Sequence, residues 1–142
     1  HVKDVAKIAK KHKLRMHLDG ARLLNALIAS GDDPKEYTSY FTTVSFCLSK
    51  GMGCPIGSVL LGTHEDLKFA KNIRKMLGGG LRQAGIIAAC MQVAMEDWRK
   101  VLTADNANCK WAAKAINSID GASVDLASVH TNMFSFVLDP TV

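Results

Sequence analysis

A chain of 142 residues is long enough for one domain that buries roughly 68–70% of the surface of its unfolded form, so a globular core is allowed. Hydrophobic residues make up 48% of the chain and charged residues 22%, which excludes the disordered and fibrous classes. The formal net charge is +5. Because the lysines gather on expected helix faces without interleaved aromatic residues, we expect a solvated surface and no nucleic-acid partner.

Cysteine spacing and apolar run lengths narrow the class further. None of the four cysteines forms a C-x-x-C pair, so we expect no metal site, no disulfide scaffold and a reducing, cytoplasmic location. No apolar run approaches the roughly 20 residues that a membrane span needs. The chain starts at His1 rather than Met and stops near a strand-and-turn region, so we expect a fragment.

The first half of the chain has the rhythm of an α/β protein. Apolar residues recur at helical spacing among lysines, followed by a short β-like run that ends at Asp19-Gly20. We expect helices at residues 2–13, at 21–30 with Gly31 as the stop, and from Pro34, and strands at 14–18 and 42–48. The second strand delivers the chain to Ser49-Lys50-Gly51.

The second half continues with a strand at 57–62 and a helix at 65–77 that the glycines at 78–80 stop. A helix from Arg82 to about Glu96 is apolar all round, so we expect it to be buried between layers. A helix at 103–119 and a strand at 133–138 follow. This tail is expected to begin a second, smaller domain.

Two expected strands end in an ionisable residue followed by glycine, Asp19-Gly20 and Lys50-Gly51. Ligands of open α/β sheets bind at the carboxyl ends of strands. A lysine that forms a Schiff base needs a crowded, partly desolvated position, and small neighbours such as Ser49 leave room for a cofactor. A surface turn explains the Ser-Lys-Gly tripeptide equally simply.

An acidic partner for such a cofactor is available. Pyridoxal phosphate (PLP) accepts electrons when its pyridine nitrogen stays protonated, and a carboxylate such as Asp19 beside that nitrogen keeps the proton there. Asp19 could instead be the N-cap of the following helix. Arg22 could grip a substrate carboxylate in a bidentate pair or could be a solvated helix residue.

Three ordered blocks then carry a specific resemblance. They are HLDGARLLNA at 17–26, LSKGMGCPIGS at 48–58 and RKMLGGGLRQ at 74–83, with Thr131-Asn132 further on. Lys50 follows Asp19 by 31 positions. In order and spacing the blocks resemble the threonine aldolase family over nearly the whole chain. The resemblance implies a PLP-dependent transferase-like large domain, a mostly parallel sheet with flanking helices, of which residues 1–103 would be part. Residues 104–142 would be the connecting helix and the start of a small α+β domain.

The resemblance also implies roles for individual residues. Lys50 would hold the cofactor as a Schiff base, Asp19 would pair with the pyridine nitrogen, and Arg22 would help hold the substrate carboxylate. Arg82 would bind the cofactor phosphate or act at a neighbouring subunit's site, with Lys75 as a companion. The alternative for Arg82 is an arginine at a helix start that faces water.

The implied reaction is the retro-aldol cleavage of L-threonine or L-allo-threonine to glycine and acetaldehyde, in a homotetramer with its sites at subunit interfaces. A phosphate-binding Gly/Thr loop, a ring-stacking residue and a further substrate arginine would lie outside residues 1–142. We therefore expect the isolated piece to fold poorly and to turn over little. Two alternatives stay open, another β-eliminating PLP lyase and a truncated non-catalytic subunit. A nucleotide-binding domain is disfavoured because the glycine run follows a helix rather than a strand.

Overall fold

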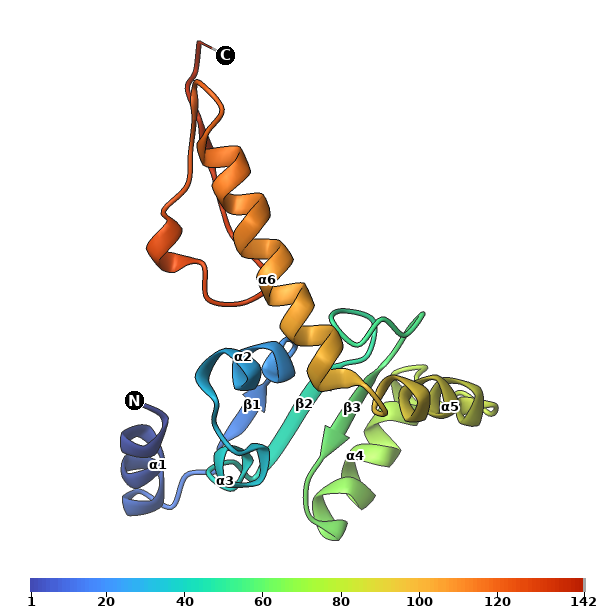
Figure 1. Ribbon diagram of the computed structural model, residues 1–142. Helices are drawn as coiled ribbons and strands as arrows, with labels where there is room; N and C mark the ends of the chain where they lie inside the picture. The colour runs from blue at the N-terminus through green and yellow to red at the C-terminus, as the bar shows by residue number, and fades with distance from the viewer. Residues whose placement is uncertain (142) are drawn as a thin grey trace.

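A three-stranded sheet forms the base of the fold in the computed structural model, which describes residues 1–141. Its strands β1 (His17–Asp19), β2 (Thr43–Cys47) and β3 (Ser58–Leu61) lie side by side in that order (Figure 1). β1 runs parallel to β2, with Asp19 opposite Ser45. β2 runs antiparallel to β3. The α/β class is confirmed, and the sheet is mixed, with its parallel part at the β1–β2 pair.

Strand β1 begins at His17, so the expectation of a strand from Leu14 is wrong. Lys13 has a left-handed backbone, with φ at 55°, and the N–H of Leu14 donates to Ala9 O at 2.8 Å. The chain therefore folds back on the preceding helix before it can pair with β2. Leu14 stays 64% exposed.

The first three helices follow the expected pattern with small shifts at their ends. They are α1 (Val2–Lys11), α2 (Leu23–Ser30) and α3 (Pro34–Thr38). Helix α2 starts two residues later than expected, since the turn at Gly20 has its carbonyl accepting from the N–H of Leu23 at 2.8 Å. Gly31 ends α2 with φ at 73°, a left-handed cap that glycine adopts without strain.

Helices α4 (His64–Met76) and α5 (Ala84–Ala94) flank the glycine turn. Thr63 caps α4 by accepting from the N–H of Asp66. The expectation that the helix after Arg82 is buried between layers is wrong, because no residue of α5 is buried. One side packs on the core through Ile87 and its neighbours, while Ile86 and Val93 are 67% and 68% exposed. A helix that is hydrophobic on all sides tends to be buried. In α5, the described residues cover only the side that carries Ile87.

Helix α6 (Trp98–Asn117) starts five residues before the expected Thr103 and runs away from the sheet (Figure 1). Its first half packs on α2, and Leu102 is 1% exposed there. Its second half contributes Ala113 to a separate cluster with Val124 and Val129 of the C-terminal segment. That segment contains β4 (Ala122–Ser123), η1 (Leu126–Ser128) and β5 (Val137–Leu138). The expected strand at 133–138 is thus reduced to two residues, and the expected division at 103/104 falls inside α6.

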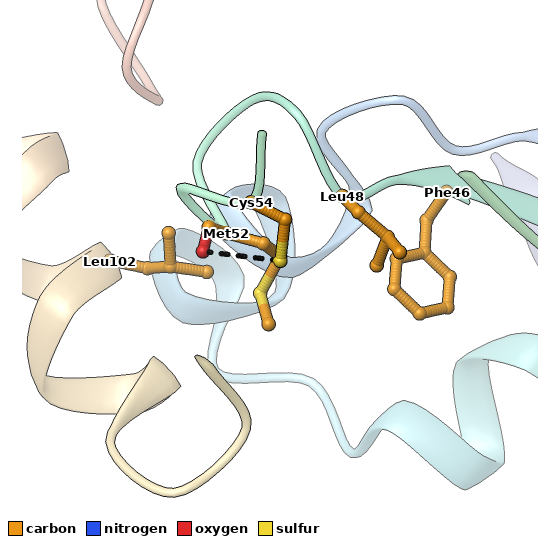
Figure 2. Packing of buried hydrophobic residues seen from close by; sticks show 5 residues of the cluster. All are labelled: Phe46, Leu48, Met52, Cys54 and Leu102. Atoms are coloured by element: carbon orange, nitrogen blue, oxygen red, sulfur yellow. Dashed lines mark hydrogen bonds between the residues drawn. The ribbon is translucent and has the colours of Figure 1, made fainter. Parts of the chain in front are cut away.

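Buried side chains on one face of β2 hold the sheet, the following turn and α6 together. The cluster, drawn in Figure 2, consists of Phe46, Leu48, Met52, Cys54 and Leu102. Leu102 points toward Met52 of the turn after β2 in that view. A second cluster of Leu23, Leu27 and Val44 seats α2 on the same sheet. Among the described residues, no helix combines the length and the apolar character that a membrane span requires.

Leu102→Ala should lower the free energy of unfolding by about 2–5 kcal/mol, because it removes a fully buried side chain where three parts of the fold meet. Val101→Ala is the matched control, since Val101 is next to Leu102 in the chain but is 52% exposed. Urea denaturation of both variants gives the comparison. Equal losses of stability would contradict this account of the core.

Candidate active site

The loop that carries Lys50 is a tight turn at the carboxyl end of β2. Leu48 still pairs beyond the strand, donating its N–H to Gly57 O at 2.9 Å. The N–H of Gly53 donates to Lys50 O at 2.8 Å, and Gly53 has φ at 69°, which a glycine adopts without strain. The N–H of Cys54 then returns to Leu48 O at 3.0 Å. Lys50 therefore lies at the start of a backbone-fixed turn.

The side of the turn that bears Lys50 faces solvent. Both Ser49 and Lys50 are exposed. The expectation that Lys50 occupies a crowded, partly desolvated position is therefore wrong for this chain, because the neighbouring cleft is open on that side. The turn itself is packed on its other side, where Met52 and Cys54 are buried.

Asp19 is the last residue of β1, at the same edge of the sheet. Gly20 follows it so closely against β2 that its N–H donates to Ser45 O at 2.8 Å, and a β-carbon there would lie 2.8 Å from that oxygen. Parallel strands bring their carboxyl ends to one edge, so Asp19 and Lys50 leave the sheet on the same side. The alternative in which Asp19 is an N-cap is wrong, because Arg22 occupies that position of α2.

A polar row lies beside Asp19 on β2, and the sequence analysis missed it. Alternate residues of a strand face opposite sides, so Thr43 and Ser45 face away from the buried Val44 and Phe46. His17 Nδ1 lies 2.8 Å from Thr43 Oγ1. The alternation of polar and apolar residues along β2 is a signal from which this row could have been found.

Arg22 has a nitrogen that lacks a partner. Its Nε is buried without a hydrogen bond within the described part of the chain. Arg22 and Gly51 line the same small cavity, so Arg22 borders the Lys50 turn. A buried N–H without an acceptor is costly, which favours an anion at this position over a solvated helix arginine.

A cleft of about 590 Å³ opens between the Lys50 turn and helix α6. Its lining includes Lys50, Gly51, Asp97, Lys100, Asp105 and Asn132. Asn132 comes from the C-terminal segment, and its Oδ1 is buried without a partner among the described residues. The fold thus joins Lys50 and Asn132, which are far apart in the sequence, at one concave surface.

Lys75 and Arg82 lie elsewhere, around the glycine turn between α4 and α5. Both are exposed, and Arg82 precedes the first residue of α5 by two positions. Within residues 1–141, neither shares a hydrogen bond or an ion pair with Lys50 or Asp19. The turn folds back over the end of α4, since a β-carbon at Gly80 would lie 3.3 Å from Lys75 Cγ.

Comparison with known proteins identifies the family. Residues 1–138 match the family described as Beta-eliminating lyase, and the chain belongs to this family. Low-specificity L-threonine aldolase 1 of Arabidopsis thaliana is 41% identical over 133 residues, which are 94% of this chain and 37% of that protein. Low specificity L-threonine aldolase of Escherichia coli K12 is 38% identical over the same share of this chain and 39% of its own length. The chain thus spans less than two-fifths of these relatives.

Solved structures share the fold. A Listeria monocytogenes protein assigned as an L-allo-threonine aldolase superposes with a TM-score of 0.80 at 23% identity, over 94% of this chain and 37% of its own. An Exiguobacterium protein assigned as an aromatic amino acid β-eliminating lyase/threonine aldolase gives a TM-score of 0.83 at 22% identity, over 95% of this chain and 38% of its own. The α/β architecture seen here is therefore shared with these two solved structures.

Cys54 reports on how tightly the Lys50 turn is packed. Burial, with a smaller contribution from Cys90, raises the pKa of its thiol, so less of the reactive thiolate is present. In the folded protein at pH 8 we expect iodoacetamide to alkylate Cys54 more slowly than the half-buried Cys47, as followed by peptide mass spectrometry. The two rates should converge in urea. Equal rates in the folded protein would show that the turn is not packed as described.

Proposed function

We propose that this chain is part of a PLP-dependent threonine aldolase, which cleaves L-threonine or L-allo-threonine to glycine and acetaldehyde. The observation that carries the proposal is the parallel pairing of β1 and β2, which brings Asp19 and Lys50 to one edge of the sheet. The names of relatives at 38–41% identity support the same reaction. The name of the matched family favours a second candidate, a β-elimination on an amino acid.

The residues present fit pyridoxal phosphate. We propose that Lys50 Nζ bonds covalently to it and that the Asp19 carboxylate holds a proton on its pyridine nitrogen. Gly51 carries no side chain to obstruct the approach to Lys50. When bound, the cofactor supplies an electron sink for the pair of electrons released from the broken Cα–Cβ bond. Lys50 would hold the cofactor between turnovers.

The substrate carboxylate has a natural partner in Arg22. Its unpartnered Nε favours an arginine–carboxylate contact, and Arg22 lies close to the Lys50 turn, since it shares the lining of a small cavity with Gly51. We propose that Arg22 holds the carboxylate close to the Lys50 turn and so orients the Cα–Cβ bond of the substrate.

We further propose that the whole protein is a homotetramer in which Arg82 and Lys75 bind the cofactor phosphate of a neighbouring subunit. Both side chains lie on the exposed α4–α5 segment. Large apolar side chains on that segment are also exposed, a property typical of interfaces, and they are Phe69, Met76, Leu77, Leu81, Ile86 and Val93. The free cysteines support a reducing compartment such as the cytoplasm.

The domain division is also a proposal. Residues 1–103 would be part of the cofactor-binding large domain, and residues 104–142 the connecting helix and the start of the small domain. Separate packing supports it, since Ala113, Val124 and Val129 form a cluster apart from the one around Leu102. The rigid connection through α6 would hold the two parts together.

Lys50→Ala should abolish both the absorbance band of the lysine–cofactor Schiff base and glycine release from L-threonine in the full-length protein, because no other group can replace the amine. Absorbance spectra with added PLP and a glycine assay give the two readings. The control is Lys11→Ala, which removes an exposed lysine at the end of α1.

The outcomes separate the candidates. A wild-type band with 2-oxobutanoate and ammonia formed from L-threonine in place of glycine would move the assignment to a β-eliminating lyase. A wild-type protein without the band would indicate a non-catalytic subunit and overturn the proposed reaction.

Asp19→Asn should leave the cofactor attached to Lys50 but lower kcat for L-threonine by about 100-fold, because the amide keeps the size and loses the charge that holds the ring proton. Steady-state kinetics on the reconstituted full-length enzyme measure the loss. Asp32→Asn, which changes an exposed aspartate in the loop before α3, should behave as wild type. An Asp19→Asn enzyme with unchanged kcat would remove Asp19 from this role.

A further inference from the structure

A buried polar network lies beneath the Lys50 turn, between helices α2 and α6. Asn25 is 2% exposed and Asn106 is 7% exposed. Asn25 Nδ2 donates to Asp105 Oδ2 at 2.9 Å and to Asn106 Oδ1 at 3.0 Å. Asn106 Nδ2 in turn donates to the backbone oxygen of Asn25 at 3.0 Å. Three hydrogen bonds thus join the two helices, with the Asn25–Asn106 pair buried and Asp105 at the edge of the cleft.

The same asparagine touches the turn that carries the lysine. A β-carbon at Gly51 would collide with Asn25 Oδ1 and would lie 2.8 Å from Leu102 Cδ2. The backbone at Gly51 is therefore seated directly on Asn25 from α2 and Leu102 from α6. Because Lys50 directly precedes Gly51 in the chain, this contact also fixes the backbone position of Lys50.

The chemistry of the network requires an amide at position 25. Its two N–H donors serve two separate acceptors on α6, while its oxygen faces Gly51. An apolar residue of the same size would leave Asp105 and Asn106 without these donors, at the cost of desolvated polar groups. An aspartate would place a second carboxylate beside Asp105.

We propose that Asn25 is a positioning residue, which holds the Lys50 turn at a fixed depth against α6 through its contact with Gly51. The start of α2 then carries two site groups, since Arg22 is its N-cap residue and Asn25 lies in its first turn. The inference rests on the proposed function for its catalytic consequence, whereas the seating of the turn is a property of the chain itself.

A double-mutant cycle between positions 25 and 51 in the full-length holoenzyme tests the proposal. Gly51→Ala should displace Lys50 and lower kcat for L-threonine by about 100-fold with little change in KM, because a shift of about 1 Å is enough for such a loss. Asn25→Ala removes Asn25 Oδ1, the nearest atom that the new β-carbon meets, and leaves the terminal methyl group of Leu102 as the remaining contact. The double variant should therefore regain at least about tenfold of the lost kcat, a coupling expected only for residues in contact.

Hydrogen exchange supplies a readout that does not depend on the cofactor. The N–H groups of Gly53 and Cys54 are bonded within the turn, so they should be protected in the wild type, exposed in Gly51→Ala and protected again in the double variant. The control is Asn72→Ala, at an exposed asparagine of α4. If Asn25→Ala does not fold, Asn25→Ser takes its place in the cycle, because it is smaller than asparagine and keeps a donor.

The two readouts tell the failures apart. Additive effects of the two substitutions on both kcat and exchange would overturn the positioning role even if borohydride traps the cofactor on Lys50. Coupled exchange in a protein whose Lys50 is never trapped would uphold the seating of the turn and overturn the proposed function instead.

Discussion

The parallel pairing of β1 with β2 is the constraint on which the rest of the structure depends. It places Asp19 opposite Ser45 and brings Gly20 within hydrogen-bonding distance of the neighbouring strand. The carboxyl ends of both strands then open at one edge, which is where an α/β sheet binds ligands. At that edge Arg22 immediately precedes α2, and the chain leaving β2 turns through Lys50. An acid, a base and an unpartnered guanidinium nitrogen thus gather from segments that the sheet alone brings together.

Local sequence patterns carried much of this arrangement. The glycines after Asp19 and Lys50, the Pro34 helix start and the left-handed stop at Gly31 all act within a few residues, so the elements around them could be predicted. The ends of helices and strands were harder to predict where tertiary contacts determine them. The strand expected from Leu14 loses its first residues to a hydrogen bond with Ala9, and α6 gains a turn because Leu102 belongs to the core.

Other features have no local signal at all. Asn25 and Asn106 are 81 positions apart, and neither pattern nor spacing indicates that their amides meet. Asn132 reaches the cleft because the C-terminal segment packs along α6. The burial expected for α5 illustrates the opposite error. The apolar sequence of a helix indicates that its burial would be favourable. Whether it is buried depends on which other surfaces pack against it.

Helix α6 has a mechanical consequence. Its 20 residues form a rod of about 30 Å, at about 1.5 Å per residue. One end is held at Leu102 under the Lys50 turn and the other carries the C-terminal segment. A tilt of about 5° about the Leu102 contact moves the far end, about 22 Å away, by about 2 Å. The helix therefore ties the position of the C-terminal segment to the packing at Leu102, so that a small change of angle at this contact becomes a displacement of whole ångströms at the far end.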